Sequence, residues 1–325
     1  MRRANGTPAL ARNRWSRDWG IFFSGGTKEP QRKRQVKTCV GVVKISSKTA
    51  KDWGLKPRTQ LSPGLEKCCL SASAQGSYQD AQRNMELMMG LKVGHSTLHR
   101  LVQRTSLPED SASHPVSSLS VDGGKIRLRT EPGSPCEWRD YKAVSLHGSV
   151  CGAFFQDNKS LIQWVNRQPL SRAPTCVGDG HDGIWNVIKD LAPHRCRREV
   201  LDWYHLVENL YKLGGAVSRL KRFQSLLWSG LVDEVIEELR GLRRSPALRL
   251  KAYLVKHRHR IIPYDLFQGL GLAIGSGGVE STIKRIAARV KLTGAQWLPG
   301  SVARILRLRC AYLNGAFQLS APLSA

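Results

Sequence analysis

The chain has 325 residues, of which 41% are hydrophobic, enough for one large domain or for two to three smaller ones. No apolar run approaches the roughly 18 residues of a transmembrane helix, so no membrane span is expected. The formal net charge of +26 indicates a polyanionic partner, with nucleic acid favoured over an anionic membrane surface. A basic protein that is merely soluble is the alternative.

Positive charge is concentrated at the two ends of the chain. Residues 1–60 contain fifteen Lys and Arg against three acidic residues, and after Glu280 there are seven Lys and Arg and no acidic residue. This distribution predicts that the ends contact phosphates and that the centre carries the chemistry.

Eight cysteines are scattered along the chain without a CxxC motif, and several lie in apolar runs. They are expected to be reduced, mostly buried thiols rather than ligands of a zinc ribbon. The basic start has no apolar stretch long enough for a signal peptide. Together these features predict a cytoplasmic protein, associated with the cell's DNA if it binds nucleic acid.

Residues 1–60 lack sustained periodicity, which predicts a basic, partly disordered arm. Within it, residues 36–46 alone resemble a strand. The arm has two interpretations, an unstructured extension or a segment that holds the DNA backbone.

A helical region is predicted over residues 61–106, with Ser77 and Ser96 as the caps of two helices joined by a short glycine-containing turn. A helix, a short turn and a basic helix are typical of a helix-turn-helix, in which the second helix contacts DNA. Its candidate DNA-binding residues are His99, Arg100 and Arg104. The alternative is an ordinary helical hairpin whose core contains Met85, Leu87, Met88 and Met89. Residues 107–117 are expected to be a linker.

The central stretch, residues 118–147, contains two alternating runs separated by the turn sequence EPGSP, which predicts a β-hairpin. Asp122 lies inside the first strand, next to two glycines that allow close approach of a backbone or a ligand. Burying a carboxylate in such a strand costs free energy unless the group is paired or has a functional role. Asp122 is therefore predicted to be a metal-binding carboxylate.

The elements that follow complete an α/β pattern. We expect a third strand (149–156), then a helix capped by Ser160 and a fourth strand that ends on Asp179. Another helix (182–193) and a fifth strand (198–205) follow. Three neighbouring strands followed by alternating helix and strand predict a mixed sheet flanked by helices. This order matches the ribonuclease H-like fold, in which the first acid lies on the first strand and the second at the end of the fourth.

After residue 205 the strand pattern stops. Residues 206–271 are predicted to be an all-helical insertion, and residues 272–325 the last part of the core. That last part contains a basic helix that carries Glu280, then a second helix over residues 302–314.

Asp122, Asp179 and Glu280 are each preceded or followed by glycines and are separated by 57 and 101 residues. Carboxylates that converge at one end of a sheet can hold two Mg²⁺ or Mn²⁺ ions about 3.5–4 Å apart for phosphodiester chemistry. Taken singly, Asp122 and Asp179 are better explained as turn residues, and Glu280 as a helix-start residue or a partner of Lys284; the combination of all three in this fold order favours the metal site. Basic residues expected to contact DNA near this site are Lys125, Lys284, Arg285 and Arg289.

Several longer motifs carry a specific resemblance. The chain contains SVDGGKIRLRT, GDGHDGIWN, LDWYHLVENLYKLGG, KHRHRI, GSGGVES and RCAYLNG. Over residues 54–315 it closely resembles the transposases of bacterial ISKra-type insertion sequences, especially cyanobacterial ones. These are DDE enzymes with a ribonuclease H-like core.

The resemblance implies that Asp122, Asp179 and Glu280 are the first, second and third acids, holding two Mg²⁺ or Mn²⁺ ions. It also implies that Asp202 and His205 form the D-x-x-H element of related families, with His205 near the site; a packed strand-end histidine is the alternative. The implied partners are double-stranded DNA, as element ends and target, and further copies of the chain.

Two other functions remain open. Relatives commonly carry a cysteine-paired segment near the N-terminus, whereas Cys39 has no CxxC partner, and residues 1–50 match poorly. A decayed copy that binds DNA without cutting it is therefore the first alternative. A different metal-dependent nuclease on the same fold is the second.

Overall fold

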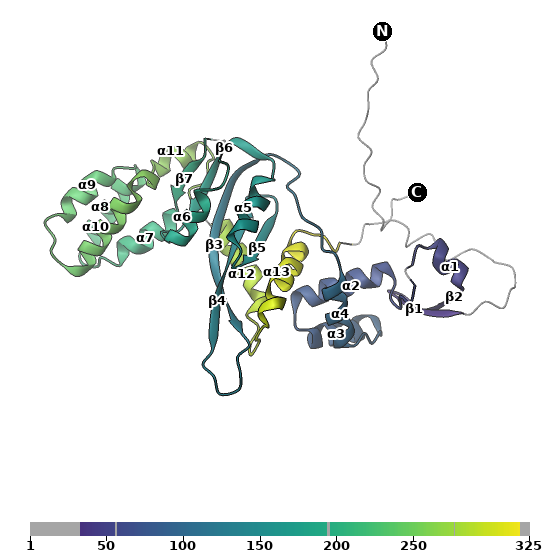
Figure 1. Cartoon of the computed structure of the whole chain (residues 1–325). Helices are drawn as coiled ribbons and strands as arrows, with labels where there is room; N and C mark the ends of the chain where they lie inside the picture. Colours follow the sequence, from purple (N-terminus) through teal and green to yellow (C-terminus); the bar gives the residue numbers. More distant parts are fainter. Residues whose placement is uncertain (1–32, 56, 194–195, 276, 319–325) are drawn as a thin grey trace, which may run out of the picture. The chain divides into compact units, whose positions relative to one another are not determined.

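The computed structural model describes residues 33–55, 57–193, 196–275 and 277–318. Residues 1–32 of the predicted basic arm and the tail after residue 318 lie outside these ranges, as do the side chains of residues 277–280. The contacts divide the chain into two compact units, residues 1–105 with 317–325, and residues 106–316 (Figure 1).

The first unit begins with a small β-hairpin. Strand β1 (Arg34–Thr38) pairs antiparallel with β2 (Gly41–Ile45), and α1 (Ser47–Asp52) follows. The prediction of a single strand over residues 36–46 is wrong because the chain reverses at Cys39 and Val40, where Gly41 has a φ of +123° that favours glycine. This part of the predicted arm is folded around a small core of Val36, Ile45 and Ala50.

Three helices complete the first unit: α2 (Pro63–Gln75), α3 (Tyr78–Met89) and α4 (His95–Arg104). Ser77 caps α3 as predicted, since its side chain accepts a hydrogen bond from the Asp80 amide. The predicted cap Ser96 is wrong, because α4 starts after Gly94 without a side-chain cap. Of the core proposed for the alternative helical hairpin, Met85 is buried, but Leu87 is 84% and Met88 79% exposed, so that prediction is wrong for Leu87 and Met88.

The second unit contains a five-stranded sheet in the order β5–β4–β3–β6–β7. Its strands are β3 (Val116–Leu128), β4 (Glu137–Leu146), β5 (Cys151–Phe155), β6 (Leu170–Gly178) and β7 (Arg198–Leu201). The β5–β4 and β4–β3 pairs are antiparallel, whereas β3–β6 and β6–β7 are parallel pairs. The predicted mixed sheet and its hairpin are confirmed, with β3 starting inside the predicted linker.

Helices cover both faces of this sheet (Figure 1). Helix α6 (Asp182–Ile188) packs so closely on β6 that a Cβ added to Gly178 would lie 3.1 Å from both Ile184 and Ile188. Helix α5 (Asn158–Asn166) packs on β4 and β5, and its cap is Asp157 rather than the predicted Ser160, whose amide donates to the Asp157 carboxylate. Helices α12 (Gly277–Val290) and α13 (Pro299–Leu313) pack against β3 and β5, respectively.

The face that α12 and α13 cover is the one that carries Asp122. Side chains alternate along a strand, so Asp122 and Gly124 share a face, and Gly124 is paired with Tyr141 of β4. Burial, with nearby Cys310 of α13 and Asp122, raises the pKa of Tyr141. Asp122 therefore lies on the α13 side of the sheet, opposite α6.

A group of helices follows β7: α7 (Trp203–Tyr211), α8 (Val217–Trp228), α9 (Val232–Leu239), α10 (Ser245–His257), the 3₁₀ turn η1 (Arg258–Arg260) and α11 (Tyr264–Gly269). The described part of residues 206–271 is helical, as predicted. Its buried side chains, such as Phe223 and Leu250, belong to the same hydrophobic cluster as Val121 and Val177 of the sheet. The helices and the sheet thus share one core.

The fifth strand is shorter than predicted. It ends at Leu201, and Asp202 is already the N-cap of α7, which places His205 in the first turn of a helix rather than at a strand end. Across the described ranges, no helix has the length and apolar character required to cross a bilayer.

Candidate active site

Three aspartates lie at the same level of three neighbouring strands: Asp122 inside β3, Asp179 directly after β6 and Asp202 directly after β7. Val121 of β3 is paired with Gly178 of β6, and Gly178 is paired in turn with Leu201 of β7, both in parallel register. The next residue in each case is Asp122, Asp179 or Asp202, and the Asp202 amide donates to the Gly178 carbonyl at 2.9 Å. Adjacent strands are about 4.8 Å apart, so this carboxylate row (Asp122, Asp179 and Asp202) spans one edge of the parallel part of the sheet.

Asp122 and Asp179 keep their carboxylates partly accessible. Both residues are half-buried. The Asp122 carboxylate accepts the Gly123 amide at 2.6 Å, and the Asp179 carboxylate accepts the His181 amide at 2.9 Å. These local hydrogen bonds fix the two side chains against their own backbones, an arrangement available to ligand oxygens and also to plain turn residues.

Asp202 has a different environment, because its side chain is 1% exposed. Its Oδ1 accepts the His205 amide at 2.8 Å, as expected of an N-cap, and lies 3.2 Å from Nδ1 of His205. The contact with Asp202, supported by the charges of Asp179 and Asp122, raises the pKa of His205 to about 9 against the opposing effect of burial. His205 is therefore an imidazolium at neutral pH, within electrostatic reach of all three carboxylates.

Helix α10 packs over the turn that carries Asp179. The ring of Tyr253 lies on Gly180 so closely that an added Cβ would be 2.4 Å from Cε2. One turn further, Lys256 Nζ lies 2.6 Å from Asp182 Oδ1, and His257 hydrogen-bonds the backbone of Gly180. Burial, then the charges of Arg260 and Lys256, lower the pKa of His257 to about 4, so it is neutral. The helical segment thus holds the Asp179 turn in place.

Replacing Gly180 with alanine is expected to destabilise the protein by about 1–3 kcal/mol, because the new methyl group overlaps the Tyr253 ring. Urea denaturation followed by circular dichroism measures this loss. The double variant Gly180→Ala/Tyr253→Leu should recover part of it, since the ring is gone. Gly300→Ala is the matched control, because nothing lies within 4 Å of that Cβ position. Equal stability of Gly180→Ala and the native chain would contradict the close packing.

Glu280 lies on α12, the helix that packs against β3, and its side chain is outside the described residues. The chain reaches α12 along the carboxylate row: the Trp203 amide donates to the Ile274 carbonyl at 3.0 Å, and a Cβ on Gly275 would lie 3.6 Å from Asp202 Oδ2. The structure brings Asp122 and Asp179 to neighbouring positions and places Gly275, two residues before the Glu280 helix, beside Asp202.

The donor chemistry of Asp122 and Asp179 fits a divalent cation, since carboxylate oxygens are the ligands that Mg²⁺ and Mn²⁺ prefer. Among the described side chains, no group of three or more His, Cys, Asp or Glu is arranged to hold a metal ion. Asp122 and Asp179 are thus two neighbouring oxygen donors, and their assignment as metal ligands together with Glu280 stays a prediction.

The predicted DNA-binding residues divide by exposure. His99, Arg100 and Arg104 lie on the exposed side of α4, with Arg104 paired to Glu66 at 2.6 Å. Lys125, Lys284 and Arg285 are exposed as well. Arg289 is 1% exposed, with its guanidinium 5.0 Å from the centre of the Trp297 ring, so its prediction as a phosphate contact is wrong. It lies on the core side of α12 because it follows buried Ile286 by three residues.

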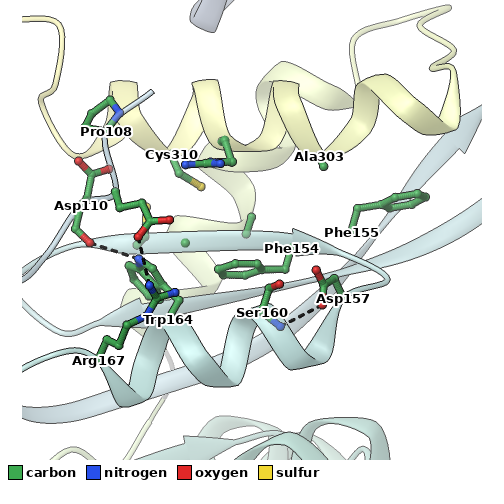
Figure 2. Close-up of a pocket in the computed structure, with 15 residues that line it drawn as sticks. Pro108, Asp110, Phe154, Phe155, Asp157, Ser160, Trp164, Arg167, Ala303 and Cys310 are labelled. Atoms are coloured by element: carbon green, nitrogen blue, oxygen red, sulfur yellow. Dashed lines mark hydrogen bonds and ion pairs between the residues drawn. The ribbon is translucent and has the colours of Figure 1, made fainter. Parts of the chain in front are cut away.

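A hollow of about 310 Å³ lies elsewhere, between β5, α5 and α13 (Figure 2). Its polar groups are bonded to one another: Asp157 accepts the Ser160 amide, the Trp164 indole donates to the Asp110 carbonyl, and Arg167 pairs with Glu109 at 3.4 Å. None of the carboxylate row lines it. The hollow therefore gives no support to a catalytic role.

No disulfide joins the eight cysteines, all of which lie in the described ranges. Cys69, Cys151, Cys176 and Cys310 are buried, whereas Cys136 and Cys196 are exposed, so the prediction of mostly buried thiols holds for half of them. Sequence reasoning missed Tyr253, Lys256 and His257 as neighbours of the Asp179 turn. The sequence signal was weak: KHRHRI is a basic run, and nothing in it indicates that its first two residues reach residues 180 and 182.

No family model matches the chain. A curated protein from Streptococcus gallolyticus, described as "UPF0236 protein in vanSb 3'region", is 22% identical over 307 residues, a match that covers 82% of this chain and 67% of that protein. The chain is thus similar, at a distance and over most of its length, to a protein whose description states no activity.

Proposed function

We propose that this chain is a DDE-type DNA transposase with a ribonuclease H-like core. The observation that carries the proposal is the placement of Asp122 and Asp179 directly after paired residues of two neighbouring parallel strands, on a sheet whose β3 is covered by the helix that bears Glu280. The strand directions and the alternation of helix and strand after β5 also agree with that fold.

The proposed reaction has two steps on DNA. In the first, water forms a new bond to the phosphorus at the element end, the bond from phosphorus to the 3′ oxygen breaks, and that oxygen takes up a proton. In the second, the freed 3′-hydroxyl loses its proton and its oxygen bonds to a phosphorus of target DNA, the bond from that phosphorus to the target's own 3′ oxygen breaks, and the released oxygen takes up a proton. Asp122, Asp179 and Glu280 would hold Mg²⁺ or Mn²⁺, which when bound would activate the attacking oxygen and stabilise the leaving one.

The chain's own residues supply charge and position. His205 keeps a proton at neutral pH next to the carboxylate row, so it presents a positive charge close to the position proposed for the scissile phosphate. The exposed side chains of Lys125, Lys284 and Arg285 would attract the DNA backbone. The contacts of Tyr253 with Gly180 and of Lys256 with Asp182 would restrain the loop that carries Asp179 and so fix the position of its carboxylate.

The test is strand cleavage by the purified full-length chain. DNA that contains the inverted repeats bracketing the gene is incubated with the protein and Mg²⁺ or Mn²⁺, and the products are separated on a denaturing gel. We expect nicks at the repeat end that depend on the divalent ion and are abolished by a chelator.

Two outcomes would replace the proposal. Tight, salt-dependent binding to the repeats with no cleavage in either metal would indicate a decayed transposase that only binds DNA. Preferential cleavage of an RNA–DNA hybrid over duplex DNA would indicate another nuclease on the same fold.

A further inference from the structure

A hollow of about 520 Å³ is present in the helical segment, between α7 and α8. Its lining consists of Trp203, Tyr211, Lys221, Gln224, Ser225 and Trp228. Three of these six side chains are aromatic, one is a cation, and two can form hydrogen bonds. Trp203 directly follows Asp202, so the hollow begins one residue from the carboxylate row.

The aromatic wall is held rigidly against the sheet. Trp203 contacts Trp228 with ring centroids 4.7 Å apart and Tyr264 with centroids 4.8 Å apart. Trp228 and Tyr264 lie nearly parallel, at an angle of 16°. The Tyr264 hydroxyl donates to the Leu201 carbonyl at the end of β7 at 2.8 Å. The wall is therefore fixed to the strand that precedes Asp202.

The polar groups of the hollow suit a planar, hydrogen-bonding ligand with a negative charge. The Tyr211 hydroxyl donates to the Oε1 of Gln224 at 3.1 Å, which leaves the amide nitrogen of Gln224 as a donor. Nearby cations on the same helices are paired, Lys212 with Glu208 and Arg222 with Glu238. Among the ion pairs of the described residues, Lys221 has none.

This chemistry distinguishes between classes of ligand. A quaternary ammonium or methylated lysine fits aromatic walls but is disfavoured by Lys221, and no carboxylate lines the hollow to offset that charge. An aliphatic side chain would leave the Gln224 amide and the Lys221 ammonium group without a hydrogen-bond partner. A nucleobase with its phosphate uses all three: the ring stacks on an aromatic side chain, the amide contacts a base edge, and the cation contacts the phosphate.

We propose that this hollow binds an unpaired nucleobase of the DNA substrate, with its ring against Tyr211 or Trp228 and its phosphate at Lys221. The inference rests on the proposed function for the identity of the substrate as DNA. A base held here, against the helix that Asp202 caps, would keep the end of a DNA strand frayed on the side of the molecule that carries the carboxylate row. Binding would therefore favour DNA with unpaired bases at the end over the fully paired duplex.

The experiment compares two DNA probes of one sequence, a blunt duplex and the same duplex with a short single-stranded end that contains 5-iodouracil. Binding of the full-length chain is measured by fluorescence anisotropy, and the iodouracil probe is then photo-crosslinked and the attached peptide identified by mass spectrometry. We expect tighter binding of the single-stranded end and a crosslink at Tyr211 or Trp228.

Two variants remove the stacking surface: Tyr211→Ala, which changes a side chain 43% exposed, and Trp228→Leu, which keeps an apolar side chain. Each should weaken binding of the single-stranded end by about 5- to 100-fold and leave binding of the blunt duplex unchanged. Trp138→Leu is the matched control, since Trp138 lies on β4 and is 52% exposed. Far-ultraviolet circular dichroism confirms that each variant is folded.

The outcomes separate this inference from the proposed function. Equal affinity for both probes, or a crosslink outside α7 and α8, overturns the nucleobase site and leaves the transposase proposal standing. Preferential binding through Tyr211 and Trp228 in a chain that cleaves no DNA supports the site and removes the catalytic proposal. Absence of binding to either probe overturns both.

Discussion

Replacing Asp122 with asparagine is expected to abolish metal-dependent DNA strand cleavage while the fold and DNA binding persist. Asparagine has the same shape and keeps an oxygen that can accept the Gly123 amide, so the hydrogen bond at 2.6 Å is retained. What is lost is the negative charge that would hold a divalent cation. Because bound metal supplies several kcal/mol of transition-state stabilisation, the rate should fall on the order of 10³-fold or more.

Asp140→Asn is the control for this variant, since Asp140 is an exposed carboxylate on β4, paired in register with Lys125. It should cleave DNA at the native rate. Gel-shift titration measures DNA binding for both proteins. Cleavage by Asp122→Asn at the native rate would remove Asp122 from the catalytic set and with it the proposed mechanism.

The same assay distinguishes the two candidates for the third carboxylate. Asp202 belongs to the carboxylate row, but it is buried and its Oδ1 is occupied by the amide and the ring of His205. Glu280 is predicted as the third acid from the sequence. We therefore expect Glu280→Gln to lose as much activity as Asp179→Asn, and Asp202→Asn to lose less. The reverse order would make Asp202 the ligand and Glu280 a helix residue.

The parts of the fold that depend on local pattern were predictable from sequence. Alternation on either side of the EPGSP turn gave the β3–β4 hairpin with Asp122 inside its first strand, and the GDG motif marked the end of β6 before Asp179. These signals depend on neighbouring residues, so one sequence is sufficient to detect them.

The errors have a common cause, which is tertiary context. A strand over residues 198–205 fits the composition of REVLDWYH, but β7 has only β6 to pair with and stops where Asp202 can cap a helix. Arg289 was assigned to the surface because it is charged, although its place on α12 buries it against Trp297. The contact of Tyr253 with Gly180 joins residues far apart in the chain, and no local pattern encodes it.

Replacing Asp202 with alanine is expected to cause one of the largest losses of stability among single substitutions in the second unit. Alanine removes the N-cap of α7 and leaves the His205 cation without its closest partner. A lost cap costs about 1 kcal/mol, and loss of an ion pair whose imidazole is 36% exposed costs about 1–2 kcal/mol more, so the free energy of unfolding should fall by about 2–3 kcal/mol. Asp202→Asn keeps an oxygen for the His205 amide and should lose less. Urea denaturation at pH 6 with a chelator measures both.

The pH dependence of the same variants tests the Asp202–His205 pair itself. The pKa of His205 is raised from 6.5 to about 9 in the folded chain, so its contribution is complete below pH 6.5 and is lost as the pH rises from 6.5 to 9. Because water screens an imidazole that is 36% exposed, this contribution is on the order of 1–2 kcal/mol. The difference in stability between the native chain and Asp202→Asn should therefore shrink over that pH interval. A difference that stays constant from pH 6 to pH 9 would show that the charge of His205 does not depend on Asp202.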